Sequence, residues 1–359
     1  MKIMTVLGTR PEIIKLSPLI PLLDKEFSHF IVHTGQHYSI EMDGVFFKEL
    51  GLSKPKYNLE VGSGTHSIQT GKMLERIEKL LLEENPDIVL VLGDTNTTLA
   101  GALAAAKANA SVGHIEAGCR SFNRDMPEET NRIIVDHISD YLFAPDDQSA
   151  VHLKKEGIDK RKIFNVGSLA VDVILRNIKF AEKSKIIEKL GVERGKYILV
   201  TVHRSENTDN LSVIKDIAGA LETVSREMQV IFAVHPRTEK LIKRNMINIS
   251  KNIIMTPPLS YLDFIKLAAN SRFIMSDSGG IQEEAAVLNV PCIILRNETE
   301  WMRLVKLGKI ILAGTKKESI IKEAMTFLVN DKRLNEMKNN QCPLVRDASK
   351  NILQILKGV

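Results

Sequence analysis

Short apolar runs alternate with longer amphipathic segments along the whole chain. Runs typical of buried strands lie at residues 3–7, 30–33, 88–92, 112–116 and 141–144, and a second series lies at 197–202, 229–234, 273–275 and 292–295. The apolar spacing of helices occurs at residues 70–84, 128–139, 211–227 and 317–329. This alternation predicts an α/β fold in which helices cover both faces of parallel sheets.

The chain divides into two halves of similar pattern. A charged stretch at residues 180–196 separates the two series of strands, and 359 residues are more than one hydrophobic core usually covers. We therefore predict two Rossmann-like domains, with the change of domain between residues 166 and 195. A short amphipathic helix at residues 351–356 fits on either domain.

Composition narrows the class of protein. The 49 basic and 44 acidic residues are scattered, which indicates a mixed solvated surface and no nucleic-acid partner, and aromatic residues make up only 5% of the chain. The longest apolar runs are too short to cross a membrane, and the N-terminus reads as a first strand, with no room for the apolar core of a signal peptide. Three widely spaced cysteines fit a reducing compartment, so we expect a cytoplasmic protein.

Ligands of open parallel sheets bind beyond the carboxyl ends of the strands, so the polar residues that follow each strand are the candidates for function. The first strand leads into GTRPEIIK at residues 8–15, where a helix start offers backbone amides to an anion. Arg10 beside it is suited to a bidentate contact with a phosphate. A plain strand-to-helix turn with a surface arginine is the competing interpretation.

Three carboxylates lie close to the same predicted sheet edge. Asp94 follows the strand at 88–92, Glu116 ends the next strand, and Glu128 lies in the first turn of a helix. Each one alone is explained by helix capping or by the helix dipole. Together they predict an acid–base site, because crowded carboxylates raise at least one pKa.

The second half has its own polar strand ends. His203 and His235 each follow a strand and each is close to an arginine, which suggests binding of a polyanion. The motif SDSGGIQEEA at residues 276–285 runs from a strand into Ser278-Gly279-Gly280 at a helix start, which predicts a diphosphate cradle. Glu284, one helical turn on, is placed to accept hydrogen bonds from ribose hydroxyls.

One further residue has two interpretations, and several cofactor motifs do not occur in the sequence. Phe264 is either one wall of a base pocket or a core residue. The first strand is not followed by Gly-x-Gly-x-x-Gly, and no Walker A sequence or metal-ligand spacing occurs, so we expect neither a nicotinamide cofactor nor a metal.

Seven motifs in order, GTRPEIIKLSP, HTGQH, LGDT, HIEAG, MPEETNR, HR and DSGGIQEEA, give the chain a resemblance to the non-hydrolysing UDP-N-acetylglucosamine 2-epimerases. The resemblance implies a GT-B-like fold of two Rossmann-like domains around a central cleft. Residues 1–168, completed by a C-terminal helix at 346–359, would form the first domain. Residues 169–345 would form a second domain that holds UDP.

The resemblance also assigns residues. It implies catalytic roles for Asp94, Glu116, Glu128 and His203, and substrate binding by Arg10, Lys15, Arg132, His235, Phe264, Ser278, Gly279, Gly280 and Glu284. Gln36 and His37 match a segment that, in bacterial relatives, contacts a second, activating UDP-N-acetylglucosamine (UDP-GlcNAc). The chain departs from the family at residues 299–303, where TEWMR replaces TERPE.

The implied reaction is reversible epimerisation at C2, which gives UDP-N-acetylmannosamine through elimination of UDP to a 2-acetamidoglucal and re-addition. It needs carboxylates near C1 and C2 and cations on the departing diphosphate, and it needs no redox cofactor. Spacing does not identify the base among the carboxylates. The alternatives are the same chemistry on UDP-2,3-diacetamido-2,3-dideoxyglucuronate, a hydrolysing epimerase, a GT-B glycosyltransferase and a non-catalytic UDP-sugar sensor. The family analogy suggests a homodimer.

Overall fold

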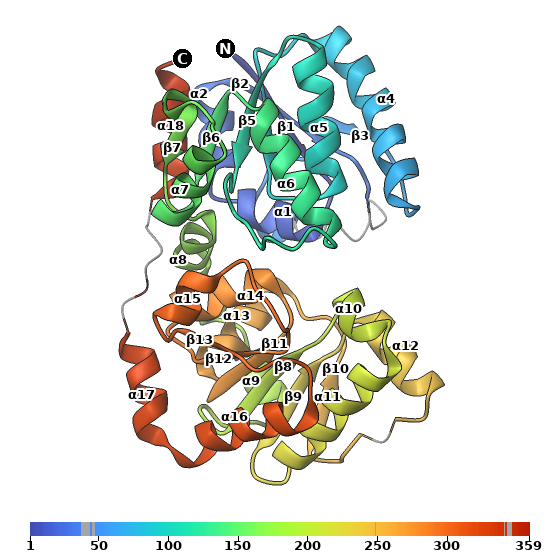
Figure 1. The fold of residues 1–359 in the computed structure, drawn as a ribbon, viewed down its shortest axis with the longest axis vertical. Coiled ribbons are helices and arrows are strands. Elements are labelled where there is room, and N and C mark those ends of the chain that lie inside the picture. Colours follow the sequence, from blue (N-terminus) through green and yellow to red (C-terminus); the bar gives the residue numbers. More distant parts are fainter. Residues whose placement is uncertain (37–43, 45–46, 248, 341, 343–346) are drawn as a thin grey trace. The chain divides into compact units, whose positions relative to one another are not determined.

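The computed structural model describes residues 1–36, 44, 47–247, 249–340, 342 and 347–359. The chain forms two compact units (Figure 1): unit 1 comprises Met1–Val173 and Leu344–Val359, and unit 2 comprises Ile174–Pro343. The change of unit falls within helix α8 (Leu169–Ala181), a few residues after the expected boundary at 168.

Unit 1 is built on a seven-stranded parallel sheet of order β3-β2-β1-β4-β5-β6-β7. Its strands are β1 (Lys2–Leu7), β2 (Ser28–His33), β3 (Tyr57–Asn58), β4 (Ile88–Leu92), β5 (Ser111–Ile115), β6 (Tyr141–Ala144) and β7 (Ile163–Asn165). Its helices are α1 (Arg10–Leu16), α2 (Ile20–Glu26), α4 (His66–Glu84), α5 (Asn96–Lys107), α6 (Pro127–Ile138), α7 (Asp147–Lys155), the 3-10 turn η1 (Lys160–Lys162) and α18 (Ala348–Lys357).

The core of unit 1 lies between this sheet and helices α4, α5 and α6, which pack side by side on one face (Figure 1). Every residue of β4 is buried, because a central parallel strand is covered on both faces. The α18 helix returns to unit 1 from the end of the chain. The Asp172 carboxylate caps it by accepting hydrogen bonds from Asp347 N and Ser349 N at 2.8 Å each, and Lys357 pairs with Glu26 at 2.6 Å.

Unit 2 has a six-stranded parallel sheet of order β10-β9-β8-β11-β12-β13. Its strands are β8 (Tyr197–Thr201), β9 (Gln229–Ala233), β10 (Ile253–Thr256), β11 (Phe273–Ser276), β12 (Cys292–Ile294) and β13 (Ile310–Leu312). Its helices are α9 (Ile186–Leu190), α10 (Ser205–Thr208), α11 (Leu211–Val224), α12 (Pro236–Arg244), α13 (Tyr261–Asn270), α14 (Gly279–Val287), α15 (Met302–Lys306), α16 (Lys317–Val329) and α17 (Asp331–Asn339). Apolar side chains of α11 and α16 pack with those of the central strands to form its core.

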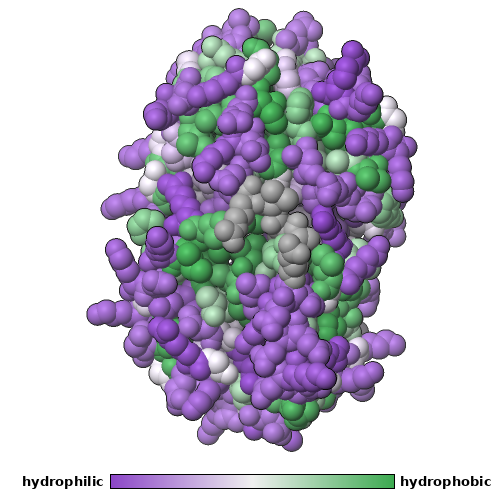
Figure 2. Space-filling model, turned by 90° about the vertical axis from the view of Figure 1, so that its left-hand side faces the viewer, coloured by the Kyte–Doolittle hydropathy of each residue, from purple (hydrophilic) through white to green (hydrophobic). Residues whose placement is uncertain are grey.

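The predicted α/β class is confirmed, with two parallel sheets in a GT-B-like two-domain fold. The sequence pattern predicted the inner strands of both sheets but missed β3, β7, β10 and β13, which are the four edge strands. Hydrophilic side chains cover much of the face drawn in Figure 2, and apolar side chains lie in patches between them. Within the described ranges, none of the helices is both long and apolar enough to cross a bilayer.

Candidate functional site

All strands of each sheet are parallel, so the loops at their carboxyl ends share one edge. In unit 1, the loops after β4 and β5 carry Asp94 and Glu116, and helices α1 and α6 carry the other predicted reaction-site residues, Arg10, Lys15, Glu128 and Arg132. In unit 2, the loops after β8, β9 and β11 carry His203, His235 and Ser278. The predicted residues therefore form two sets, one in each unit.

The first contact in unit 1 joins Lys15 and Glu116. Lys15 Nζ donates to Glu116 Oε1 at 2.5 Å, and both side chains are largely buried, with exposures of 18% and 12%. Glu116 directly follows β5 and has a φ of 69°, a left-handed conformation that is uncommon for glutamate. Backbone of this kind persists where the surrounding structure holds it, and such residues cluster at functional sites.

The second contact in unit 1 joins Asp94 and Arg132. The Arg132 guanidinium from α6 donates to the Asp94 carboxylate, and its Nη1 donates to Glu129 Oε2 at 2.9 Å. Glu129 is buried and also accepts from the amides of Ser121 and Phe122. Burial alone would raise the Glu129 pKa, but these hydrogen bonds and Arg132 outweigh it and hold the pKa below its ordinary value. Glu129 therefore stays ionised and fixes Arg132 against Asp94.

Arg10 and Glu128 occupy the starts of two helices in unit 1. Arg10 is the first residue of α1, and Glu128 lies in the first turn of α6. Glu128 is half-buried and has no hydrogen bond or ion pair to any residue that the structure describes. An unpaired carboxylate at this strand-end edge is available to a ligand.

Sequence reasoning missed Glu12, which is buried beneath these loops. Its Oε2 accepts from Gly8 N and Thr9 N at 2.8 Å each, and its Oε1 accepts from Thr95 Oγ1 at 2.8 Å. Burial raises the Glu12 pKa, and the hydrogen bonds oppose that rise. The side chain ties the start of α1 to the loop that carries Asp94. The signal was present as the capping box of α1, which Thr9 and Glu12 form.

In unit 2, Asp277 organises the loop that carries His203. The carboxylate is fully buried at the end of β11. It accepts from His203 N at 3.1 Å, Arg204 N at 3.0 Å and Asn207 Nδ2 at 3.0 Å, and His203 Nδ1 lies 3.2 Å from its Oδ1. Burial would raise the Asp277 pKa, but His203 and the amide donors hold it below the ordinary value. The His203 ring itself is 43% exposed and so remains accessible.

His235 lies next to His203, with 6.4 Å between the ring centroids. It caps α12, and its Nδ1 accepts from Arg237 N at 3.2 Å. Partial burial, together with the neighbouring His203 and Arg237, lowers the His235 pKa. The ring is therefore neutral near pH 7 and carries its hydrogen on Nε2, where it can donate to an oxygen of a ligand.

The start of α14 has the geometry of an anion site. Ser278 is the N-cap, and Gly279 and Gly280 begin the helix with Glu284 one turn later. A Cβ on Gly279 would lie 2.3 Å from Glu300 Oε1, so a side chain there would have to displace the Glu300 carboxylate. A Cβ on Gly280 would meet no described atom within 4 Å. The space at Gly280 is thus open for a ligand to approach the helix amides.

The departing segment at residues 299–303 lies against the same helix. Thr299 Oγ1 donates to Gln282 Oε1 at 2.5 Å, and Trp301 is buried. Glu300 accepts from Arg296 Nη1 at 3.0 Å. Trp301 is thus a core residue here. Phe264 is half-buried on α13, a position that fits either of its two interpretations.

Gln36 and His37 were expected at a site for an activating UDP-GlcNAc. Gln36 is buried, and its side chain accepts hydrogen bonds within unit 1. Its Oε1 accepts from Thr97 N at 3.1 Å and from Thr97 Oγ1 at 2.7 Å. His37 lies outside the described residues. The structure therefore gives the Gln36 carboxamide oxygen a structural partner.

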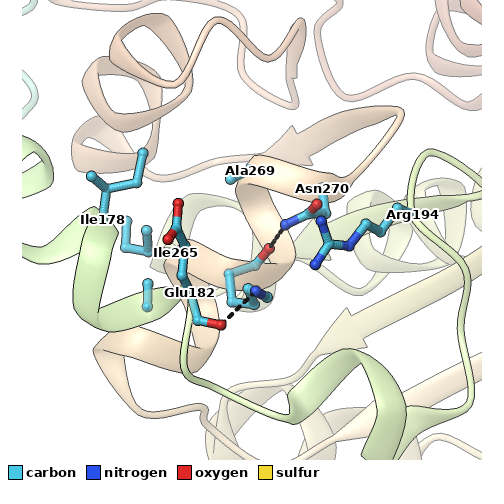
Figure 3. A pocket seen from close by; sticks show the side chains of 8 residues that line it. Ile178, Glu182, Arg194, Ile265, Ala269 and Asn270 are labelled. Carbon is cyan, nitrogen blue, oxygen red and sulfur yellow. Dashed lines mark hydrogen bonds between the residues drawn. The ribbon is translucent and has the colours of Figure 1, made fainter.

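A cavity of about 500 Å³ in unit 2 lies elsewhere (Figure 3). It lies between α8 and α13, with Glu182, Arg194 and Lys266 among its polar lining. Lys266 Nζ donates a hydrogen bond to the Glu182 carbonyl oxygen at 2.8 Å. None of the predicted site residues lines this cavity, so it is no part of the predicted site. Across the described residues, acidic, histidine and cysteine side chains form no group of three or more that could hold a metal.

Two units, each built on a parallel sheet with polar residues at its strand ends, place the protein in the GT-B-like class. The sequence model for UDP-N-acetylglucosamine 2-epimerase matches residues 23–357. The chain belongs to the UDP-N-acetylglucosamine 2-epimerase family, whose members are isomerases.

Similar proteins agree with this assignment. The UDP-N-acetylglucosamine 2-epimerase of Methanocaldococcus jannaschii is 50% identical over 343 residues, which is 93% of each chain. Its crystal structure in complex with UDP-GlcNAc and UDP matches with a TM-score of 0.93 and covers 100% of both chains. The UDP-2,3-diacetamido-2,3-dideoxy-D-glucuronate 2-epimerase of Pseudomonas aeruginosa is 42% identical over 333 residues, 91% of this chain and 92% of that one.

Proposed function

We propose that this protein interconverts UDP-GlcNAc and UDP-N-acetylmannosamine by epimerisation at C2. The observation that carries the proposal is the pairing of two predicted carboxylates with two predicted cations in unit 1, Glu116 with Lys15 and Asp94 with Arg132. The identity of 50% to an archaeal UDP-GlcNAc 2-epimerase supports the choice of substrate.

We assign the nucleotide to the start of α14 in unit 2. The amides behind Gly279 and Gly280 and the Ser278 hydroxyl would receive the diphosphate, and Glu284 would accept from the ribose. His235, as a neutral donor, and His203, held by Asp277, would contact the phosphate oxygens. Phe264 would face the uracil. The open space at Gly280 supports this assignment.

We assign the proton chemistry to unit 1. The C2 hydrogen of the sugar is barely acidic until the C1–O bond to UDP begins to break and positive charge builds at C1. A carboxylate then removes the C2 proton, the electron pair of the C2–H bond forms the C1–C2 double bond, and UDP leaves with the C1–O pair. Protonation of the planar glycal on the other face, with return of UDP to C1, gives the epimer.

The cations of unit 1 have two uses in this scheme. Lys15 and Arg132 would hold the Glu116 and Asp94 carboxylates in place through their ion pairs, and Arg10 at the start of α1 would stabilise the departing diphosphate. Glu128 has no partner among the described residues and is a further candidate for the acid or base. The base among the three carboxylates stays open.

A second substrate is supported by one observation. An epimerase named for UDP-2,3-diacetamido-2,3-dideoxy-D-glucuronate is 42% identical to the chain. That sugar has the same acetamido group at C2 and so allows the same elimination. It differs by a carboxylate at C6 and a second acetamido group at C3, so recognition of those groups would decide between the two substrates.

The test is a proton NMR time course of the purified protein with each UDP-sugar and no added cofactor. We expect UDP-GlcNAc to reach an equilibrium mixture with UDP-N-acetylmannosamine, faster than any change in the diacetamido sugar. Heat-denatured protein serves as the inactive control. Net release of UDP with free N-acetylmannosamine would indicate a hydrolase, and binding without turnover would indicate a sensor.

Two further predictions concern the protein as a whole. A homodimer is expected, and light scattering of the purified chain at several concentrations tests it. A cytoplasmic location is also expected from the use of cysteine. Both remain predictions.

A further inference from the structure

His114 lies in the middle of the unit 1 sheet and takes no part in the scheme above. It belongs to β5, and its side chain is completely buried. Its Nδ1 lies 2.6 Å from Asp136 Oδ1, and its Nε2 lies 2.8 Å from the carbonyl oxygen of Gly93. Both ring nitrogens therefore have a partner.

These partners determine the hydrogens on the ring. A backbone carbonyl can only accept, so Nε2 must carry a hydrogen. Asp136 is also an acceptor, because its Oδ2 receives Gly118 N at 3.1 Å and lies 2.6 Å from Arg120 Nη2. Burial would raise the Asp136 pKa, but His114 and Arg120 hold it below its ordinary value. Nδ1 faces this carboxylate, so the ring bridges Asp136 and the Gly93 carbonyl.

The network also contains a buried arginine. Arg120 Nη2 lies 2.6 Å from Asp136 Oδ2, and Arg120 donates to Glu156 through Nε at 2.8 Å and through Nη2 at 2.7 Å, so one cation faces two carboxylates. A buried cation is tolerated only when it is paired and hydrogen-bonded in this way.

The two residues held by this network flank the reaction-site loops. Gly93 directly precedes Asp94, and Gly118 comes two residues after Glu116. We propose that His114, held between Asp136 and the Gly93 carbonyl, is a positioning residue that holds the loops carrying Asp94 and Glu116. This inference rests on the proposed function, because it concerns the same reaction.

A second buried histidine in the same sheet provides a matched control. His29 on β2 also pairs through Nδ1 with an aspartate, Asp24 at 2.5 Å, and its ring is fully buried. Its Nε2, however, lies 2.9 Å from Thr5 Oγ1, a hydroxyl that can donate or accept, so the ring is free to be neutral. Burial lowers the His29 pKa despite Asp24. His29 also lies near the amino end of its strand, away from the reaction-site loops.

The first measurement is nitrogen NMR of the protein labelled with 15N at histidine, with His114 assigned by loss of its signals in His114→Asn. We expect the His114 Nε2 to show a bonded hydrogen, because its partner is the Gly93 carbonyl oxygen, which can only accept. A His114 Nε2 without a hydrogen would overturn the proposal. This measurement uses the unsubstituted protein, so it remains decisive if a variant fails to fold.

The second measurement is the kinetics of three variants. An asparagine at 114 can replace the Nδ1–H donor toward Asp136 but does not reach Gly93, whereas a glutamine can reach Gly93. We expect His114→Asn to lower kcat roughly 10- to 100-fold, the loss that small misplacement of a catalytic group causes. We expect His114→Gln to restore part of that loss, and His29→Asn to leave kcat unchanged. KM and UDP affinity should stay within about threefold of wild type, because nucleotide binding is assigned to unit 2.

The outcomes separate this proposal from the function on which it rests. Absence of epimerisation by the unsubstituted protein would overturn the proposed function and the positioning role with it. Normal epimerisation with an equal loss of kcat in His114→Asn and His29→Asn would overturn the positioning role alone, since it would indicate a general packing effect.

Discussion

Replacement of Asp277 by asparagine removes a negative charge from the centre of the loop that carries His203. In the folded protein, the carboxylate is fully buried and accepts from two backbone amides, those of His203 and Arg204, and from Asn207 Nδ2. Asparagine has nearly the same shape, so it creates no cavity. The asparagine side chain is neutral, however, and an NH2 donor replaces one of the two carboxylate oxygens. The substitution therefore isolates the contribution of the charged acceptor.

The structure allows the size of the effect to be worked out. A hydrogen bond to a charged group contributes about 1.5–3 kcal/mol and a neutral one about 0.5–1.5 kcal/mol, so each of the three donors to Asp277 loses about 1 kcal/mol. The total of about 3 kcal/mol corresponds to a fall of roughly 6–12 °C in the melting temperature of a unit of this size. UDP binding should also weaken, because Ser278 follows directly.

The dependence on pH gives a second check on Asp277. Its folded-state pKa is lowered, so its stabilisation is complete above the unfolded pKa of about 3.9 and is lost as the pH falls toward the folded value. The difference in melting temperature between wild type and Asp277→Asn should stay constant from pH 7 to about pH 5 and shrink below about pH 4.

Differential scanning calorimetry measures both effects. The control is Asp331→Asn, which removes a carboxylate that is 79% exposed and paired with Arg272, and which should shift the melting temperature by no more than about 1 °C. A shift for Asp277→Asn as small as that of the control would refute the reasoning. So would a difference that grows as the pH falls.

The other predictions concern the two halves of the proposed site. Asp94→Asn, Glu116→Gln and Glu128→Gln should each lower turnover about 100-fold or more, as loss of an acid or base does, with a smaller change in KM; near-normal turnover would make that residue a structural one. Ser278→Ala should weaken UDP binding roughly tenfold in calorimetry through one lost hydrogen bond, and unchanged affinity would remove Ser278 from the diphosphate site. Gly280→Ala should also weaken UDP binding, because its methyl group enters the open space, while the melting temperature should not fall. A fall in the melting temperature together with the loss of affinity would indicate that Gly280 is needed for packing and not for UDP.

The sequence pattern predicted the inner strands because these strands are nearly continuous apolar runs. The edge strands lack that signal. β3 is Tyr57–Asn58 and is only partly buried, and β7 ends in the exposed Asn165. A strand with one neighbour is partly open to solvent, so polar residues interrupt its pattern and leave it indistinguishable from a loop.

The candidate site was predictable to a similar extent. The position of a residue directly after a strand placed Asp94 and Glu116 at one edge, but the pattern could not show their partners. Glu12 and Asp277 were visible only as parts of motifs, since their importance comes from burial and from donors distant in the sequence. His114 was hidden for the same reason: it lies in a buried central strand, and only the folded structure shows that both of its ring nitrogens have acceptors as partners.

The mechanism is tested most directly by running the reaction in D2O. Elimination and re-addition require the C2 hydrogen to leave as a proton onto a side chain that exchanges with solvent. With UDP-GlcNAc as substrate, the account predicts that UDP-N-acetylmannosamine carries deuterium at C2 and nowhere else on the ring. Substrate recovered after many turnovers should carry it at C2 as well. Epimer that still lacks deuterium at C2 after prolonged incubation would contradict the account.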